Sequence, residues 1–282
     1  MPSIIEIIKN RKSCRSYAER EPEPEKIAVL EGFMAENNRG FFGSDIKFKL
    51  IKFNETPKEA LKELGAYSII KGAKLFIAGI VKKQGRYLED YGYCMEKNIL
   101  KAAGLGLATC WLGATFNRGG FSENMRAGDG EVVPAVTPVG YAAEKRRLAE
   151  NVMRAAIGAD SRKPVEEIYF AGSFGNPARP QDVIKEAMNC VRLAPSASNK
   201  QPWRVLDETR RQSGAAEVRF LHFFLERDKG YIYPEGQNID MGIAMCHFEY
   251  ACLELGAGGR WVVEKPSCDP GGREYIASWF FL

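Results

Sequence analysis

Two stretches of the chain, "GYCMEKNILKAAGLGLATCW" (92–111) and "GIAMCHFEYACLELGAGGRW" (242–261), align with each other without a gap. Each has the composition of a long helix that ends in Leu-Gly before a tryptophan, and glycine commonly follows the last turn of a helix. The alignment pairs Gly92 with Gly242, Met95 with Met245, Leu105 with Leu255, Gly106 with Gly256 and Trp111 with Trp261. A few identities arise by chance, so the pattern indicates an internal repeat that the rest of the chain must support.

The predicted elements around these helices follow one order in both halves. In the first half, hydrophobic periodicity predicts helices over 4–10, with Ser3 and Glu6 as a capping box, and over 24–36, strands over 45–53 and 72–81, and a long helix from Asp90 to about Leu107. In the second half it predicts a helix over 180–194, strands over 203–208 and 217–226, and a helix over 238–256. This shared order predicts two related halves, residues 1–178 and a shorter 179–282.

Size and charge narrow the class of protein. With 282 residues, of which 45% are hydrophobic, the chain can bury a large core. Its 40 basic and 36 acidic residues give a net charge of +4, without the concentrated basic stripe that duplex nucleic acid selects. The most basic segment, 142–154, mixes Lys145, Arg146 and Arg147 with glutamates, which predicts an exposed helix face. We therefore expect no nucleic-acid partner.

Cysteine and histidine give no sign of a metal or disulfide site. The seven cysteines form no Cys-x-x-Cys pair, which predicts free and mostly buried thiols. The two histidines, His222 and His247, lack a second ligand at metal-binding spacing, so a structural role is expected for them. Since no run of 18 apolar residues and no secretory signal is visible, we expect a soluble, cytoplasmic protein without a membrane partner.

The segment "RKSCRSY" (11–17) has no counterpart in the second half. If it is extended, Arg11, Ser13 and Arg15 point to one side and bring two guanidiniums and a hydroxyl to one place. Arginine binds phosphate through paired, charge-assisted hydrogen bonds, so this arrangement suits a phosphate group. The alternative is a pair of surface arginines after a helix.

Two further segments could line a ligand. In "APSASNKQPW" (194–203), proline fixes the backbone, small residues let a ligand approach, and Asn199 offers both a donor and an acceptor; the alternative is an ordinary turn. In "TCWLGAT" (109–115), backbone N–H groups could face a planar ligand; the alternative is a glycine at a helix end. The first half has only "AENNRGFFGS" (35–44) where the second has "APSASNKQPW", so the halves look complementary.

Together, "RKSCRSY", "APSASNKQPW", "GLGLATCWLG" and "SRKPVEEIYF" (161–170) resemble the FMN-dependent nitroreductase family. The resemblance implies an α+β nitroreductase-like fold and covers nearly all of residues 4–282. That family forms an intertwined homodimer with FMN at the interface, where each site combines segments of both subunits. This chain resembles two such subunits fused, and a monomer is expected to act as a pseudo-dimer.

The resemblance also assigns cofactor-binding residues. It implies that Arg11, Lys12, Ser13 and Arg15 lie near the phosphate and ribityl chain, with Arg162 and its neighbour Lys163 adding charge. From the other side, Pro195, Ser196, Ala197 and Asn199 would line the cofactor. Trp111, Leu112 and Gly113 would lie by the isoalloxazine, with a backbone N–H approaching N5. Ser68 falls nearest to a further family contact that precedes the strand over 72–81.

The resemblance implies one intact site and crossed chain segments. The second site would need an Arg-Ser segment at the start of the second half, where the chain reads "FGNPARPQDV" (174–183), so one FMN per chain is expected. In the family each subunit's C-terminal segment crosses onto its partner. We therefore expect 165–170 to pair with the second half and 273–282 to pair with the first.

Implied function follows from the cofactor. The flavin performs the chemistry, so no catalytic side chain is assigned. NADH or NADPH would deliver hydride and leave, and a small-molecule acceptor such as a nitroaromatic or quinone would take the electrons in a ping-pong cycle. Phe41 and Phe42 could cover the acceptor pocket or belong to the core. Two alternatives are an FMN storage or sensor protein without significant turnover and a scaffold whose site has decayed.

Overall fold

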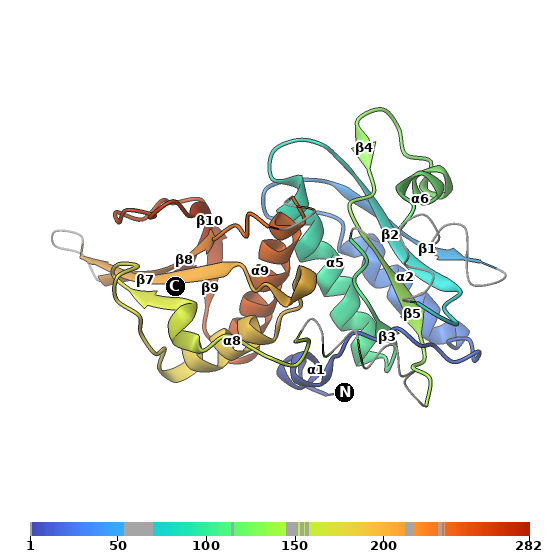
Figure 1. The fold of residues 1–282 in the computed structure, drawn as a ribbon, viewed down its shortest axis with the longest axis horizontal. Coiled ribbons are helices and arrows are strands. Elements are labelled where there is room, and N and C mark those ends of the chain that lie inside the picture. Colours follow the sequence, from blue (N-terminus) through green and yellow to red (C-terminus); the bar gives the residue numbers. More distant parts are fainter. Residues whose placement is uncertain are drawn as a thin grey trace. The chain divides into compact units, whose positions relative to one another are not determined.

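The computed structural model describes residues 2–53, 70–113, 116–144, 152, 155, 158–211, 217–230, 233 and 235–282. The chain forms two compact units (Figure 1). The first unit contains Asn10–Asp160, and the second contains Ser3–Lys9 together with Ser161–Leu282. Residues 3–9 and 161–178, which precede position 178 or end at it, thus pack in the second unit.

The first unit is built on an antiparallel sheet with the strand order β1-β2-β5-β3, and β4 pairs with the end of β2. Its elements are α2 (Pro24–Glu36), β1 (Ile46–Lys52), β2 (Leu75–Lys82), α5 (Tyr87–Gly104), β3 (Ala108–Thr109), α6 (Arg118–Met125), β4 (Glu131–Val132) and β5 (Val136–Gly140). The apolar run of β2 fits a central strand with both faces buried. Phe76 packs against Phe121 of α6, while Gly79 donates its amide to Tyr91 of α5 at 3.1 Å.

The second unit has its own sheet, with the order β6-β7-β8-β10-β9. Its elements are α1 (Ile4–Asn10, in this unit as far as Lys9), η1 (Val165–Glu167), β6 (Tyr169–Ala171), α8 (Asp182–Leu193), η2 (Ala197–Asn199), β7 (Trp203–Arg211), β8 (Glu217–Leu225), α9 (Gly236–Glu254), β9 (Gly259–Val262) and β10 (Glu274–Phe281). Phe223, Phe248, Trp261 and Trp279 form an aromatic core between the sheet and α9.

Both sheets share one topology. Strands β1, β2, β5 and β3 correspond in order and direction to β7, β8, β10 and β9, and a long helix, α5 or α9, follows the second strand of each set. Each long helix is followed by a glycine with positive φ, 77° at Gly106 and 70° at Gly256. The order of elements predicted for both halves is therefore confirmed.

Two segments of the first half of the sequence, α1 and β6, pack in the second unit. Helix α1 begins with the predicted capping box, since Ser3 Oγ accepts from the Glu6 amide at 3.2 Å, and its Ile4 amide donates to Glu254 of α9. Strand β6 pairs in parallel with β7, with Tyr169 opposite Val205. The predicted pairing of 165–170 with the second half is confirmed.

The expected pairing of 273–282 with the first half is wrong. Strand β10 lies between β8 and β9, with Ser278 opposite His222 and Trp279 opposite Trp261. Trp279 completes the aromatic core of the second unit, with its ring centroid 5.2 Å from that of Trp261. Pairing with β9, only a short connection away, also costs less loop entropy than pairing across the chain.

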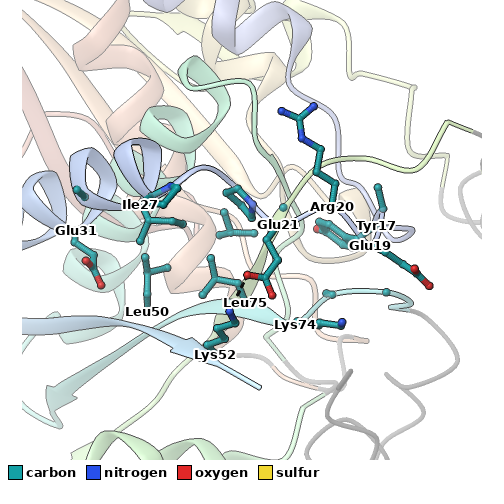
Figure 2. Close-up of a pocket in the computed structure, with 18 residues that line it drawn as sticks. Tyr17, Glu19, Arg20, Glu21, Ile27, Glu31, Leu50, Lys52, Lys74 and Leu75 are labelled. Carbon is teal, nitrogen blue, oxygen red and sulfur yellow. Dashed lines mark hydrogen bonds and ion pairs between the residues drawn. The ribbon is translucent and has the colours of Figure 1, made fainter. Parts of the chain in front are cut away.

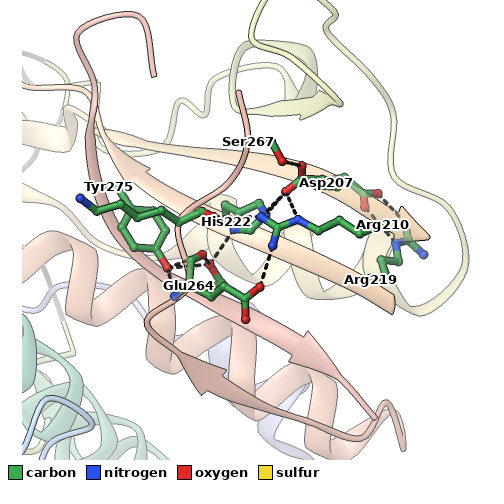
Figure 3. Close-up of polar contacts among 10 residues, drawn as sticks. Asp207, Arg210, Arg219, His222, Glu264, Ser267 and Tyr275 are labelled. Atoms are coloured by element: carbon green, nitrogen blue, oxygen red, sulfur yellow. Dashed lines mark hydrogen bonds and ion pairs between the residues drawn. The ribbon is translucent and has the colours of Figure 1, made fainter. Parts of the chain in front are cut away.

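A polar network covers the face of the second sheet opposite α9 (Figure 3). The imidazole of His222 is fully buried, with Nε2 2.8 Å from Glu208 Oε2 and Nδ1 2.6 Å from Ser278 Oγ. The loop after β9 joins through Ser267, which donates to Glu208, and Glu264, which accepts from Arg210. Burial lowers the pKa of His222 despite the attraction of Glu208. This histidine therefore has the expected structural role.

The thiols agree with the expectation of free and mostly buried cysteines. All seven cysteines are free, and five of them are buried. Burial raises the pKa of Cys190 and of Cys252 to about 12, so these thiols are protonated at neutral pH. None of the helices among the described residues has the length and apolar character needed to cross a membrane.

Candidate functional site

The segment from Arg11 to Tyr17 is fixed along one end of the first sheet. The amide of Cys14 donates to Thr109 O, and that of Lys71 donates to Arg15 O, both at 2.9 Å. Lys12 points to solvent, while the Arg11 side chain is only 6% exposed. This difference in exposure agrees with the predicted extended segment, in which Arg11 and Arg15 point to one side and Lys12 points to the other.

The guanidiniums of Arg11 and Arg15 are incompletely paired. In each, Nε and Nη1 are buried and have no hydrogen-bond partner among the residues that the structure describes. A buried donor without a partner costs roughly 1–3 kcal/mol, and more when it is charged. An oxyanion is the ligand that would satisfy these donors, because arginine pairs with phosphate and carboxylate in charge-assisted geometry.

Glu96 is a residue of this group that the sequence did not point out. Its fully buried carboxylate accepts from Trp111 Nε1 at 2.6 Å and lies 3.9 Å from Arg11 Nε. It therefore links the Arg-Ser segment to the Trp-Leu-Gly loop within the first unit. The sequence signal that could have pointed to Glu96 was an acidic residue within a largely buried helix, α5. The gapless alignment places Cys246 opposite it, so this link has no copy at the same position of α9.

The Trp-Leu-Gly loop has part of its backbone already engaged. Leu112 is buried and exchanges two backbone hydrogen bonds with Val136, at 2.9 and 3.0 Å. Its amide is therefore not the N–H donor that the resemblance would place at a flavin N5. Gly113 accepts from Arg118 through its carbonyl at 2.8 Å. That Trp111, Leu112 and Gly113 lie by a flavin stays a prediction.

In the second unit, the loop from Pro195 to Gln201 has an unusual backbone. Three of its non-glycine residues have positive φ: Ser198 at 49°, Asn199 at 54° and Gln201 at 49°. Such conformations cost about 1–3 kcal/mol each and concentrate at functional sites. The loop is closed by Ser196 Oγ, which accepts from the Gln201 amide at 2.9 Å.

This loop lies against the predicted basic residues. Arg162 Nη1 donates to Asn199 Oδ1 at 3.4 Å, and Asn199 Nδ2 donates to Ser161 O at 3.0 Å. The amide of Lys163 donates to Gln201 Oε1 at 3.0 Å. The structure thus brings together two segments whose residues are 37 or 38 positions apart.

A second buried cation supports the same loop. Arg204, 6% exposed, donates to Gln201 O at 3.0 Å and pairs with Glu226. Burial lowers the pKa of Lys163, and the nearby positive charge of Arg204 lowers it further. The second unit therefore concentrates positive charge at this loop. Gln201 and Arg204 were not among the predicted site residues, although both stand in or directly after the quoted motif.

A buried aspartate lies beneath each of the two corresponding loops. Asp240 of α9 accepts from the Ala197 amide through both oxygens, at 3.1 and 3.2 Å. Asp90 of α5 accepts from the Phe42 amide at 2.8 Å and the Ser44 amide at 2.9 Å. The gapless alignment, extended by two residues toward the N-terminus, pairs Asp90 with Asp240, and this signal was available in the sequence.

Two remaining expectations concern the pair Phe41 and Phe42, and Ser68. Phe41 and Phe42 are half-buried, with ring centroids 4.7 Å apart and the Arg86 guanidinium over the Phe42 ring. Ser68 lies outside the described residues. The described part of the chain contains no cluster of three or more side chains that could hold a metal ion.

A pocket of about 430 Å3 opens in the first unit beside the start of α2 (Figure 2). Its apolar walls include Ile27, Leu50, Leu75 and Val139. The charged side chains that line it balance, with Glu19, Glu21 and Glu31 against Arg20, Lys52 and Lys74. Glu21 already pairs with Lys52 at 2.7 Å. The described residues that line this pocket include none of the predicted cofactor-binding residues, so we separate it from the candidate site.

Comparisons with known proteins give a family and a fold. A family model described as "Putative TM nitroreductase" matches residues 3–252. The solved structure described as "a putative nitroreductase" from Thermotoga maritima is 18% identical and covers 99% of this chain and 93% of that one, with a TM-score of 0.58. No curated protein matches the chain.

Other solved structures match part of the chain. An FMN-dependent nitroreductase from Clostridium difficile, 21% identical, covers 50% of this chain and 88% of that one, with a TM-score of 0.39. A nitroreductase family protein from Clostridium difficile 630, also 21% identical, covers 59% of this chain and 96% of that one, with a TM-score of 0.43.

Proposed function

The chain belongs to the nitroreductase family described as "Putative TM nitroreductase", and from this premise we propose that it is an FMN-dependent oxidoreductase. Its electron donor is NADH or NADPH, and its acceptor is a small molecule such as a nitroaromatic or a quinone. The α+β fold, with two similarly built units in one chain, is that of the similar Thermotoga structure over nearly the whole length.

The observation that carries this proposal is the state of Arg11 and Arg15. Their buried Nε and Nη1 atoms have no hydrogen-bond partner among the described residues, and the FMN phosphate is an oxyanion that would supply one. The residues present therefore fit the group that the family implies. Ser13 adds a hydroxyl on the same side of the extended segment, and Lys12 adds an exposed positive charge.

The second unit provides the other predicted group. Arg162 and Lys163 donate to Asn199 and Gln201 of the strained loop, which also contains the predicted residues Pro195, Ser196 and Ala197. That both groups serve one flavin rests on the family resemblance of their motifs.

The proposal of a single site also has support within the second unit. Arg179 is the only basic residue of the segment 174–183, and its Nε lies 2.5 Å from Glu166 Oε1. A cation already paired with a carboxylate is a poor phosphate ligand. We propose that the chain arose by fusion of two family subunits, one of whose sites has been lost.

FMN, when bound, supplies the hydride-transfer chemistry between the nicotinamide and the acceptor. The protein's part is to bind and orient it. Glu96 holds the Trp111 indole in place through Nε1 and the Arg11 side chain through charge. The buried Arg11 and the cluster around Arg162 provide positive charge that would stabilise negative charge on a reduced flavin. No side chain is assigned as a proton donor.

An absorption spectrum of the purified protein tests the proposal first. Flavin bands, or a saturable change in flavin fluorescence on titration with FMN, are expected. Steady-state oxidation of NADH and NADPH with a quinone then tests turnover. FMN binding without turnover would identify a storage or sensor protein, and a colourless protein that does not respond to added FMN would contradict the proposed function.

A further inference from the structure

The two buried aspartates occupy equivalent places in the two units. Asp90 is the fourth residue of α5 and Asp240 the fifth residue of α9, and the gapless alignment pairs them. Their exposed fractions are 1% and 3%. Asp90 accepts two backbone amides from the loop before β1, and Asp240 accepts one from the loop before β7, the strand that corresponds to β1. The repeat therefore uses a buried carboxyl group to fasten that loop to the long helix.

The two carboxyl groups differ in how well they are satisfied. Asp90 receives the Phe42 amide on one oxygen and the Ser44 amide on the other. Asp240 receives one amide, that of Ala197, shared between its two oxygens. Burial raises the pKa of Asp240 to about 8, and the Ala197 amide is the one opposing influence. Burial therefore favours the protonated form of Asp240.

The loops fastened by the two aspartates also differ. The loop over Asp90 contains Gly43, which adopts its positive φ of 94° without strain. The loop over Asp240 places Ser198, Asn199 and Gln201 at positive φ, so it stores strain that its contacts must offset. Ala197 immediately precedes these residues, and its amide is the contact with α9.

We propose that Asp240 is a positioning residue of the FMN site, which fixes the Ser196–Asn199 loop on α9 through the Ala197 amide, whereas Asp90 fastens a loop with no part in that site. This inference rests on the proposed function. Ionisation of Asp240 would leave a buried negative charge with one donor. This charge would oppose an anionic ligand, so FMN affinity should fall between pH 7 and pH 9.

Three variants of the full chain test this role: Asp240→Leu, Asp240→Asn and Asp90→Leu. The readouts are the FMN dissociation constant at pH 7 and pH 9, and amide hydrogen exchange of residues 195–201 and 39–44 without FMN. Asp240→Leu should weaken FMN binding at least tenfold at pH 7 and raise exchange over 195–201. Asp90→Leu, the matched control, should raise exchange over 39–44 and leave FMN affinity unchanged.

The conservative variant separates positioning from mere packing. Asn still accepts from the Ala197 amide through Oδ1 and resembles the protonated carboxyl group. Asp240→Asn should therefore bind FMN within about threefold of the wild type at pH 7 and lose the weakening at pH 9. It also keeps the test decisive if Asp240→Leu does not fold.

Several outcomes would overturn the inference. They are wild-type FMN affinity in Asp240→Leu, unchanged exchange over 195–201 in that variant, or the same pH dependence in Asp240→Asn as in the wild type. Failure of the wild type to bind FMN would instead overturn the proposed function. In that case the exchange of 195–201 still decides whether Asp240 fastens the loop.

Discussion

Arg11 and Arg15 carry an energetic cost that a ligand would remove. Their unpaired guanidinium nitrogens are buried, and Glu96 offsets only part of the charge of Arg11. Natural proteins leave few such groups unsatisfied, and those that remain concentrate at sites with a function. Single residues thus mark the candidate site.

The double variant Arg11→Ala with Arg15→Ala should weaken FMN binding by about two to four orders of magnitude, because a hydrogen bond to a charged group contributes roughly 1.5–3 kcal/mol. Fluorescence titration measures this change. Arg11→Lys keeps the charge beside Glu96 and should weaken FMN binding less. Lys49→Ala, on the exposed side of β1, is the control and should leave FMN affinity unchanged. Unchanged affinity in the double variant would remove the segment from the site.

Structural elements were predictable where the local sequence decides them. Helix α2 begins at Pro24 and ends at Glu36 as predicted, because proline suits the first helical position and polar residues follow the apolar repeat. The partner of β10 was not predictable from its own pattern, because the alternation of a strand fixes its faces and not its neighbour. Glu96 and Asp240 were missed for a related reason: their role lies in a contact with a distant loop.

Strand β6 should be important for the stability of the second sheet despite its three residues. Phe170, 7% exposed, packs with Leu206 and Phe224. Phe170→Ala should lower the free energy of unfolding by about 3 kcal/mol, near the lower end for a buried phenylalanine. Urea denaturation measures the loss. Val263→Ala, at a 65% exposed position, is the control, and an equal effect of both changes would argue against β6 as a packed strand.

The network around His222 should make stability fall in mild acid. Because burial lowers the pKa of His222, the unfolded chain binds the proton more readily below the ordinary pKa of 6.5. Unfolding is therefore favoured as pH falls from 7.5 to 5.5. Asp240 acts in the opposite direction over this range, since its pKa is raised in the folded chain.

The comparison with His222→Gln isolates the contribution of the histidine. The urea midpoints of the wild type and of His222→Gln are measured at pH 7.5 and at pH 5.5. The wild type should lose more stability than the variant between these two values, and equal losses would mean that His222 does not titrate in this range.

The whole molecule combines two units of the same topology with different sites. The two units have the same sheet order and the equivalent aspartates Asp90 and Asp240. The Arg-Ser segment occurs only in the first unit, and the strained loop only in the second. Residues of α1 and β6 precede position 178 in the sequence and lie in the second unit. We expect such a chain to hold one FMN, because the segment around Arg179 offers a cation already paired with Glu166.

Native mass spectrometry of the chain with added FMN tests this claim most directly. A single chain should bind one FMN as a monomer, with occupancy independent of protein concentration. The second site lacks several charge-assisted bonds, worth roughly 4–8 kcal/mol together, and should stay empty at micromolar FMN. Two FMN per chain, or binding by a dimer of chains alone, would contradict the account.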